Sequence, residues 1–133
     1  MAARLYLKGK ENLLGGNVDL QNDTIVALLV TGQYIPNTDS DETRAAIPSS
    51  AIIAEETLAS TKITDGVFDA DDLVFTEVVG PPIRYIVIIK DADIYSQAKL
   101  IALIDDAPQF PITPDGSNIT IQWDNGANKI FSI

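Results

Sequence analysis

The sequence predicts an all-β domain, an antiparallel β-sandwich or barrel of about seven or eight strands. Short runs of isoleucine, valine and leucine recur along the chain at fairly regular spacing, and turn-forming residues separate them. Near the end, apolar and polar residues alternate from Ile119 to Trp123, which is the period of a half-buried strand. The length of 133 residues, without a repeat or a linker, fits one domain.

Residues 1–16 are predicted to form an N-terminal arm, and residues 17–133 a single β domain. The glycine pair Gly15-Gly16 is a helix-ending signal, so a short helix is compatible with the charged stretch before it. The arm either packs on its own domain or reaches a neighbouring subunit. We expect the β domain to fold without residues 1–12.

The strands of the domain are expected in seven main segments. These are residues 24–30, 51–58, 62–64, 73–78, 83–89, 99–104 and 119–123, with a return strand at 130–133. Residues 83–89 have the strongest β propensity. Residues 33–50 form a long polar loop, in which Ser40 can cap a short helical stretch from Asp41 to Ala46. Pro48 ends that stretch.

The last two strands are predicted to pair as a hairpin around Asp124-Asn125-Gly126. A three-residue loop with Gly126 in the left-handed conformation places one apolar set on a single face, whereas a two-residue turn splits it. That set is Ile119, Ile121, Trp123, Phe131 and Ile133. We therefore expect Trp123 in the core, together with Phe75, Ile86 and Ile88.

Histidine and cysteine are both absent from the chain. Catalytic triads that use either residue are excluded, as are zinc sites built on them. The sequence also lacks the glycine-rich loops that bind nucleotide phosphates. We therefore expect no enzymatic activity and no cofactor.

The net charge is −10, from 9 basic and 19 acidic residues. Nucleic acids and anionic membranes attract basic surfaces, so neither is an expected partner. The acidic surface either serves solubility alone or meets a basic partner. No apolar run has the length of a membrane-spanning helix, and the first residues lack the apolar stretch of a signal peptide. We expect a soluble protein made in a cytoplasm.

Two groups of acidic residues are candidate sites. Asp65, Asp69, Asp71 and Asp72 could ligate a hard cation such as calcium, but their order does not match the calcium loop of an EF-hand. A plain turn is the favoured interpretation, and we assign no metal site. The pair Asp105-Asp106 could in principle serve glycoside hydrolysis, but it follows a strand end and a solvated loop is the favoured interpretation.

The aromatic residues divide into two groups. Phe75, Trp123 and Phe131 occupy apolar strand positions and are expected in the core. Tyr34 and Tyr95 lie in loops and are the better candidates for contact with a partner.

Three segments resemble small virion structural proteins of tailed bacteriophages, the head-decoration or capsid-cement proteins. They are NDTIVALLV at 22–30, TDGVFDADDLVF at 64–75 and ITIQWDNGANKIF at 119–131, so the resemblance extends over nearly the whole chain. Pro81-Pro82 and the acidic link Asp91–Asp93 have no counterpart in it. The resemblance implies a non-catalytic protein that binds the outside of a shell of major capsid protein, often as a trimer. It also implies location in the virion after synthesis in a bacterial host.

The predicted partner contacts are apolar residues that lie outside the strand pattern and have few expected neighbours in the sequence. They are Leu5, Leu7, Leu13 and Leu14 in the arm, and Tyr34 and Ile35 in the loop 33–50. A tail or neck component is an alternative within the same class. A carbohydrate- or ligand-binding sandwich would instead show an exposed aromatic platform or a calcium site. A carboxylate-dependent hydrolase would show two convergent acids in a cleft.

Overall fold

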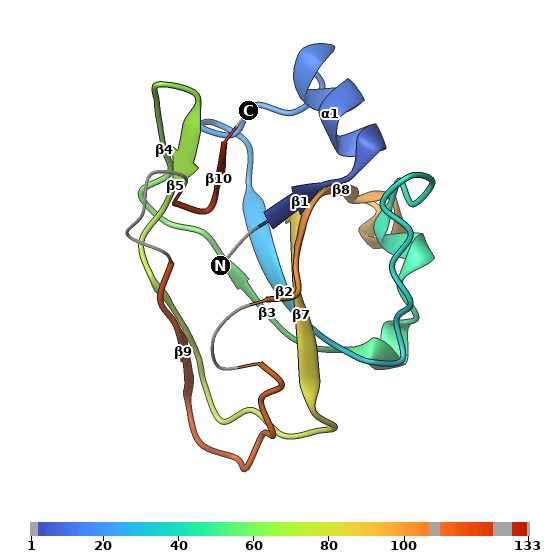
Figure 1. The fold of residues 1–133 in the computed structure, drawn as a ribbon, viewed down its shortest axis with the longest axis vertical. Helices are drawn as coiled ribbons and strands as arrows, with labels where there is room; N and C mark the ends of the chain where they lie inside the picture. Colours follow the sequence, from blue (N-terminus) through green and yellow to red (C-terminus); the bar gives the residue numbers. More distant parts are fainter. Residues whose placement is uncertain (1–2, 107–109, 124–128, 133) are drawn as a thin grey trace.

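A five-stranded antiparallel sheet forms the centre of the molecule (Figure 1). The computed structural model describes residues 3–106, 110–123 and 129–132. The strand order of the large sheet is β1-β8-β7-β2-β3. These strands are β1 at Ala3–Leu5, β2 at Ile25–Thr31, β3 at Ile52–Thr57, β7 at Ile83–Lys90 and β8 at Lys99–Ile104. The all-β prediction is confirmed.

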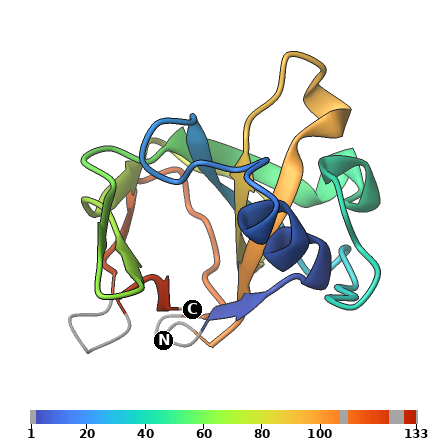
Figure 2. The same ribbon diagram turned by 90° about the horizontal axis from the view of Figure 1, so that it is seen from above.

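Two smaller sheets face one side of this large sheet (Figure 2). One has the order β10-β5-β4, from Phe131–Ser132, Val67–Asp69 and Lys62–Thr64. The other pairs β6, Leu73–Phe75, with β9, Ile119–Ile121. Their apolar side chains pack on the large sheet and form the main core, so the arrangement is a β-sandwich.

The central strands of the large sheet are buried on both faces, which explains the continuous apolar sequence of β2. All seven residues of β2 are buried. Ile25, Ala27 and Leu29 pack toward the two small sheets. The alternate residues, such as Val26 and Leu28, pack in a second cluster on the opposite face. A strand covered on both sides needs apolar residues at every position.

The loop 33–50 covers that opposite face instead of decorating the surface. Tyr34 and Ile47 from the loop are buried against the second cluster. The expected helix from Asp41 to Ala46 is reduced to a 3-10 turn at Arg44–Ala46, and Thr43, not Ser40, precedes it without a side-chain cap. Two further 3-10 turns lie at Ser49–Ala51 and Tyr95–Gln97.

The N-terminal arm belongs to the folded domain over its described residues. Ala3–Leu5 forms β1 and pairs with β8, Ala3 opposite Ile104, and Tyr6 is fully buried. Leu7–Leu14 forms helix α1, which ends at Gly15 as predicted. Gly9 lies so close to β8 that an added Cβ would be 2.7 Å from the Ile101 carbonyl oxygen. The expectation that the arm lies outside the strand pattern is therefore corrected, because β1 belongs to the large sheet.

The predicted C-terminal hairpin is wrong, although the predicted burial is confirmed. β9 pairs with β6, and β10 pairs with β5, so the last two strands belong to different sheets. Ile121, Trp123 and Phe131 are nonetheless buried, as are Phe75, Ile86 and Ile88. The Asp124-Asn125-Gly126 turn and Ile133 lie outside the described residues. Alternation assigns a strand to a face, but it does not choose the strand's partner.

The acidic segment 65–72 contains a strand that the sequence pattern did not reveal. β4 and β5 form a hairpin with Thr64 opposite Val67, so Asp65-Gly66 is a two-residue loop. Both residues have positive φ, 53° and 76°, which is the signature of a type I′ turn. The plain-turn interpretation of Asp65 is confirmed. No helix of the described residues is long and apolar enough to cross a membrane.

Candidate functional site

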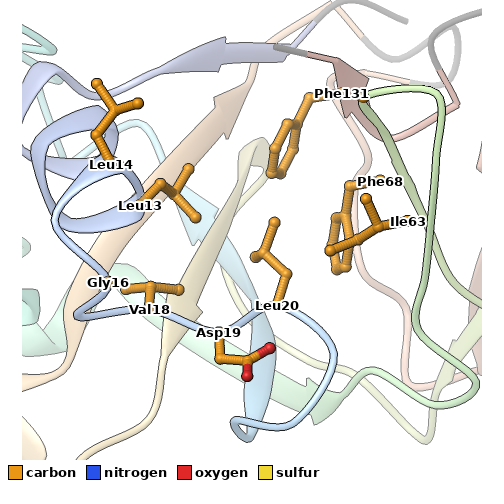
Figure 3. Close-up of a pocket in the computed structure, with 10 residues that line it drawn as sticks. Leu13, Leu14, Gly16, Val18, Asp19, Leu20, Ile63, Phe68 and Phe131 are labelled. Atoms are coloured by element: carbon orange, nitrogen blue, oxygen red, sulfur yellow. The ribbon is translucent and has the colours of Figure 1, made fainter.

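An open apolar groove of about 420 Å³ lies where the end of α1 meets the β10-β5-β4 sheet (Figure 3). In Figure 3, Leu13 lies at one side of it and Phe68 at the other, with Leu20 and Phe131 between them. We call it the apolar groove, and its main lining residues are Leu13, Leu14, Val18, Asp19, Leu20, Ile63, Phe68 and Phe131. Leu14 at its rim is 85% exposed, and Ile63 is 43% exposed.

Local turns hold the groove open at its lower rim. Gly16 has a φ of 78°, which turns the chain away from α1. The Asp19 carboxylate then accepts hydrogen bonds from the backbone amides of Gln21, 3.1 Å, and Asn22, 3.2 Å. Together with the Asn22 side-chain amide, these bonds hold the pKa of Asp19 below its usual range. The single charged residue of the groove is therefore an anion at neutral pH.

The chemistry of the groove is that of binding. Its surface offers apolar side chains and one carboxylate that local amides already bind, so it can hold an apolar group with a neutral or basic neighbour. Within the described residues, no three carboxylates gather in a group that could hold a metal ion.

Whereas the groove lies at the end of α1, Leu5 and Leu7 at the start of that helix line a second hollow of about 650 Å³. We call it the basic hollow, since Arg4 and Lys10 line it together with Asp39. The predicted contacts of the arm are therefore divided between two surfaces, because Leu13 and Leu14 line the apolar groove. Ile35 is exposed, at 86%, and lies in neither.

Tyr34 is a buried anchor, and its prediction as a surface contact is corrected. It is 1% exposed, and its hydroxyl donates to the Asp41 carboxylate over 2.6 Å while lying 2.9 Å from the Tyr6 hydroxyl. Burial raises the pKa of both phenols well above the usual tyrosine value, and the bond to Asp41 raises that of Tyr34 further. The pair fastens the loop 33–50 to the start of α1.

Arg44 forms a second anchor of the same loop. Its guanidinium donates to Glu55 of β3 over 2.6 Å and lies 3.3 Å from the ring centroid of Tyr95. The Tyr95 hydroxyl donates to the same carboxylate. Burial lowers the pKa of Arg44, and the nearby Glu55 charge opposes that shift. Tyr95 is exposed as predicted, although one face of its ring is occupied by Arg44.

The other acidic candidates have structural partners. Asp72 accepts the backbone amide of Trp123 over 2.9 Å, and the Asp71 carbonyl accepts the Trp123 indole N–H. Asp105 forms an ion pair with Arg4, 2.7 Å. All nine aromatic side chains lie in the described ranges, and Tyr95 is the one that is exposed.

Apart from Leu13 and Leu14, the main lining residues of the apolar groove were missed as site residues from the sequence, namely Val18, Asp19, Leu20, Ile63, Phe68 and Phe131. The available signal was weak: Val18 and Leu20 are apolar residues in a turn-rich segment. Ile63 and Phe68 face each other across the β4–β5 pair, a register that only the folded hairpin defines. Searches of known family models and of curated proteins found no match to this chain.

Proposed function

We propose that this protein is a non-catalytic structural protein of a tailed-bacteriophage virion, which binds the outer surface of the major capsid protein shell and stabilises it. The observation that carries the proposal is the apolar groove, whose rim residue Leu14 is almost fully exposed. Apolar surface of this kind usually marks a site of contact with a partner. The resemblance of three segments to decoration proteins supplies the class of that partner.

The groove suits a contact repeated over a symmetric surface. A shell subunit that inserts an apolar side chain between Leu14 and Ile63 would bury both. A basic neighbour on that subunit would face the Asp19 anion, and electrostatic complementarity of this kind fixes the register of a contact. Single contacts can be weak, because many copies on one shell, particularly when linked to each other, gain avidity.

Two alternative functions would use the same groove. A tail or neck component would bind a different virion protein in far fewer copies per particle. A small-molecule binding module is favoured by the groove volume, which lies within the usual range for ligand sites of roughly 300–1,000 Å³. A carbohydrate platform has less support, because it needs two or three exposed rings and Tyr95 alone is exposed.

The composition of purified particles tests the proposal. Virions produced from a genome that encodes this chain should contain it in proportion to the capsid subunits, as quantitative mass spectrometry would measure. Particles without it should assemble but break at lower temperature or milder osmotic shock. Absence from virions overturns the proposal, and a few copies per particle assign the chain to the tail or neck instead.

A groove variant tests the surface itself. Leu14→Asp places a charge at the rim of the groove and should abolish binding of the purified protein to bare shells. Val79→Asp is the matched control, because Val79 is also well exposed, at 68%, and lies outside the groove. Equal binding of both variants would exclude the apolar groove as the shell contact.

A further inference from the structure

The β7–β8 loop, residues 91–98, carries an apolar tip between acidic residues. It projects from the body of the molecule at the top of Figure 2. Ile94 is 58% exposed, and Tyr95 beside it is 55% exposed. Asp91 and Asp93 precede this tip, and neither carboxylate has an ion pair within the described part of the chain. The loop therefore projects an apolar tip that lies beside two negatively charged side chains.

The basic hollow has the opposite character. The segment 3–14 carries three basic residues and one acidic residue, a net charge of +2 in a chain whose total is −10. Leu5 and Leu7 give the hollow an apolar wall. Arg4 is already paired with Asp105, but Lys10 has no ion-pair partner among the described residues. The hollow therefore offers apolar surface beside an unpaired cation.

Charge distinguishes the basic hollow from the apolar groove. An acidic loop that approached the apolar groove would meet Asp19, a like charge. At the basic hollow the loop would meet the unpaired Lys10 and also Arg4, whose guanidinium already pairs with Asp105, beside the carboxylate of Asp39. Juxtaposed like charges are costly and opposite charges favour encounter, so the β7–β8 loop is complementary to the basic hollow.

The loop and the hollow lie far apart on one molecule, because the loop projects at one side of Figure 2 and β1 lies at the other. We propose that the β7–β8 loop of one copy docks in the basic hollow of a second copy. Different patches then meet at each contact, so association is head-to-tail and can repeat from copy to copy. The apolar groove remains free, and the proposal does not depend on what that groove binds.

Charge reversal on both sides of the contact tests the proposal. The full chain should form species heavier than a monomer in sedimentation equilibrium over a concentration series. Lys10→Glu and Asp93→Lys should each weaken association about tenfold, because each places like charges together. The double variant should regain most of the lost affinity, because the two opposite charges then face each other with their positions exchanged. Glu77→Lys is the control for net charge, because Glu77 is exposed between β6 and β7, bonds the Asn118 side chain through its backbone amide and belongs to neither patch, so the substitution should leave association unchanged.

A mixing experiment tests the head-to-tail geometry. Ile94→Asp removes the docking tip and Leu7→Asp removes the apolar wall of the hollow, and each variant alone should be monomeric. Their equimolar mixture should form a complex of two chains and nothing larger, because each pair keeps one intact loop and one intact hollow. Circular dichroism of each variant checks that these exposed substitutions preserve the fold.

Three results would overturn the proposal. A wild-type chain that stays monomeric throughout the series has no self-association. Association that survives both single reversals uses a different surface. If the double variant associates as weakly as the two single variants, Lys10 and Asp93 do not face each other across the contact.

Discussion

The two faces of the large sheet are covered by different kinds of structure. On one face, the small sheets contribute apolar side chains such as Phe68, Phe75 and Phe131, and the contact is almost entirely hydrophobic. On the other face, the loop 33–50 contributes Tyr34 and Ile47, and hydrogen-bonded side chains accompany them. The same sheet is thus covered by paired strands on one face and by irregular backbone on the other.

The difference shows what irregular backbone needs in order to cover a sheet. Strands satisfy most of their backbone groups in ladders and present alternate side chains to the core. A loop has few such ladders, so individual polar side chains must fix its path. Asp41 accepts both the Tyr34 hydroxyl and the Asn37 backbone amide, and Arg44 ties the loop to β3. We therefore expect packing to dominate on the first face and a few polar anchors on the second.

The largest effect is expected on the strand-covered face. Trp123→Ala removes a large buried side chain and its indole hydrogen bond, and it should lower the free energy of unfolding by about 3–5 kcal/mol. Chemical denaturation monitored by far-UV circular dichroism measures this. Val74→Ala, at an exposed position of β6, should change it little. A loss below about 1 kcal/mol for Trp123→Ala would contradict its place in the core.

Arg44→Ala should have the next largest effect, a loss of about 2–3 kcal/mol of unfolding free energy. The value lies below that for a fully buried ion pair, because Glu55 is half exposed and stays hydrated when its partner is removed. Arg84→Ala, at an exposed position of β7, is the control. A double-mutant cycle with Glu55→Gln should give a coupling energy above that of surface pairs. Additive effects would show that Arg44 acts by packing alone.

Tyr34→Phe should cost about 2 kcal/mol at neutral pH, because it removes a hydrogen bond to the charged Asp41 and takes the Tyr34 partner from the buried Tyr6 hydroxyl. Because burial raises the folded-state pKa, the unfolded wild type loses the Tyr34 proton first as pH rises. Stability from this group is therefore complete below the ordinary value of 10.0 and declines above it. The gap between the two proteins should shrink above that pH in urea titrations. A gap that is independent of pH would contradict the buried phenol.

Much of the fold could be predicted from sequence because local pattern determines strand type and burial. The strand Lys99–Ile104 was predicted with its observed bounds, and the buried face of the last strands is correct. Partners could not be predicted, since β1 is three residues long and pairs with residues that lie far along the chain. β5 was hidden by the acidic residues on either side of Val67–Asp69.

The candidate sites were predictable only in part, for a physical reason. Leu14 can be recognised in the sequence as an apolar residue outside the strand pattern, and the structure places it at the apolar groove. Tyr34 could not be distinguished from them, because its burial depends on Tyr6 and Asp41 arriving from other parts of the chain. A surface hollow is a property of packing between elements, whereas sequence pattern reports on one element at a time.

The pairing of β1 with β8 sets the order of events during synthesis. Ala3 pairs with Ile104, so β1 leaves the ribosome about 100 residues before its partner strand, which is roughly 5–20 s at ordinary rates of translation. During that time Tyr6 and the inner face of α1, which contacts β8 at Gly9, lack the β8 surface against which they pack in the folded domain. The nascent chain therefore carries an incompletely buried apolar segment until β8 has been made. Chaperones and proteases can reach this segment in that interval, and the edge of the sheet is completed late.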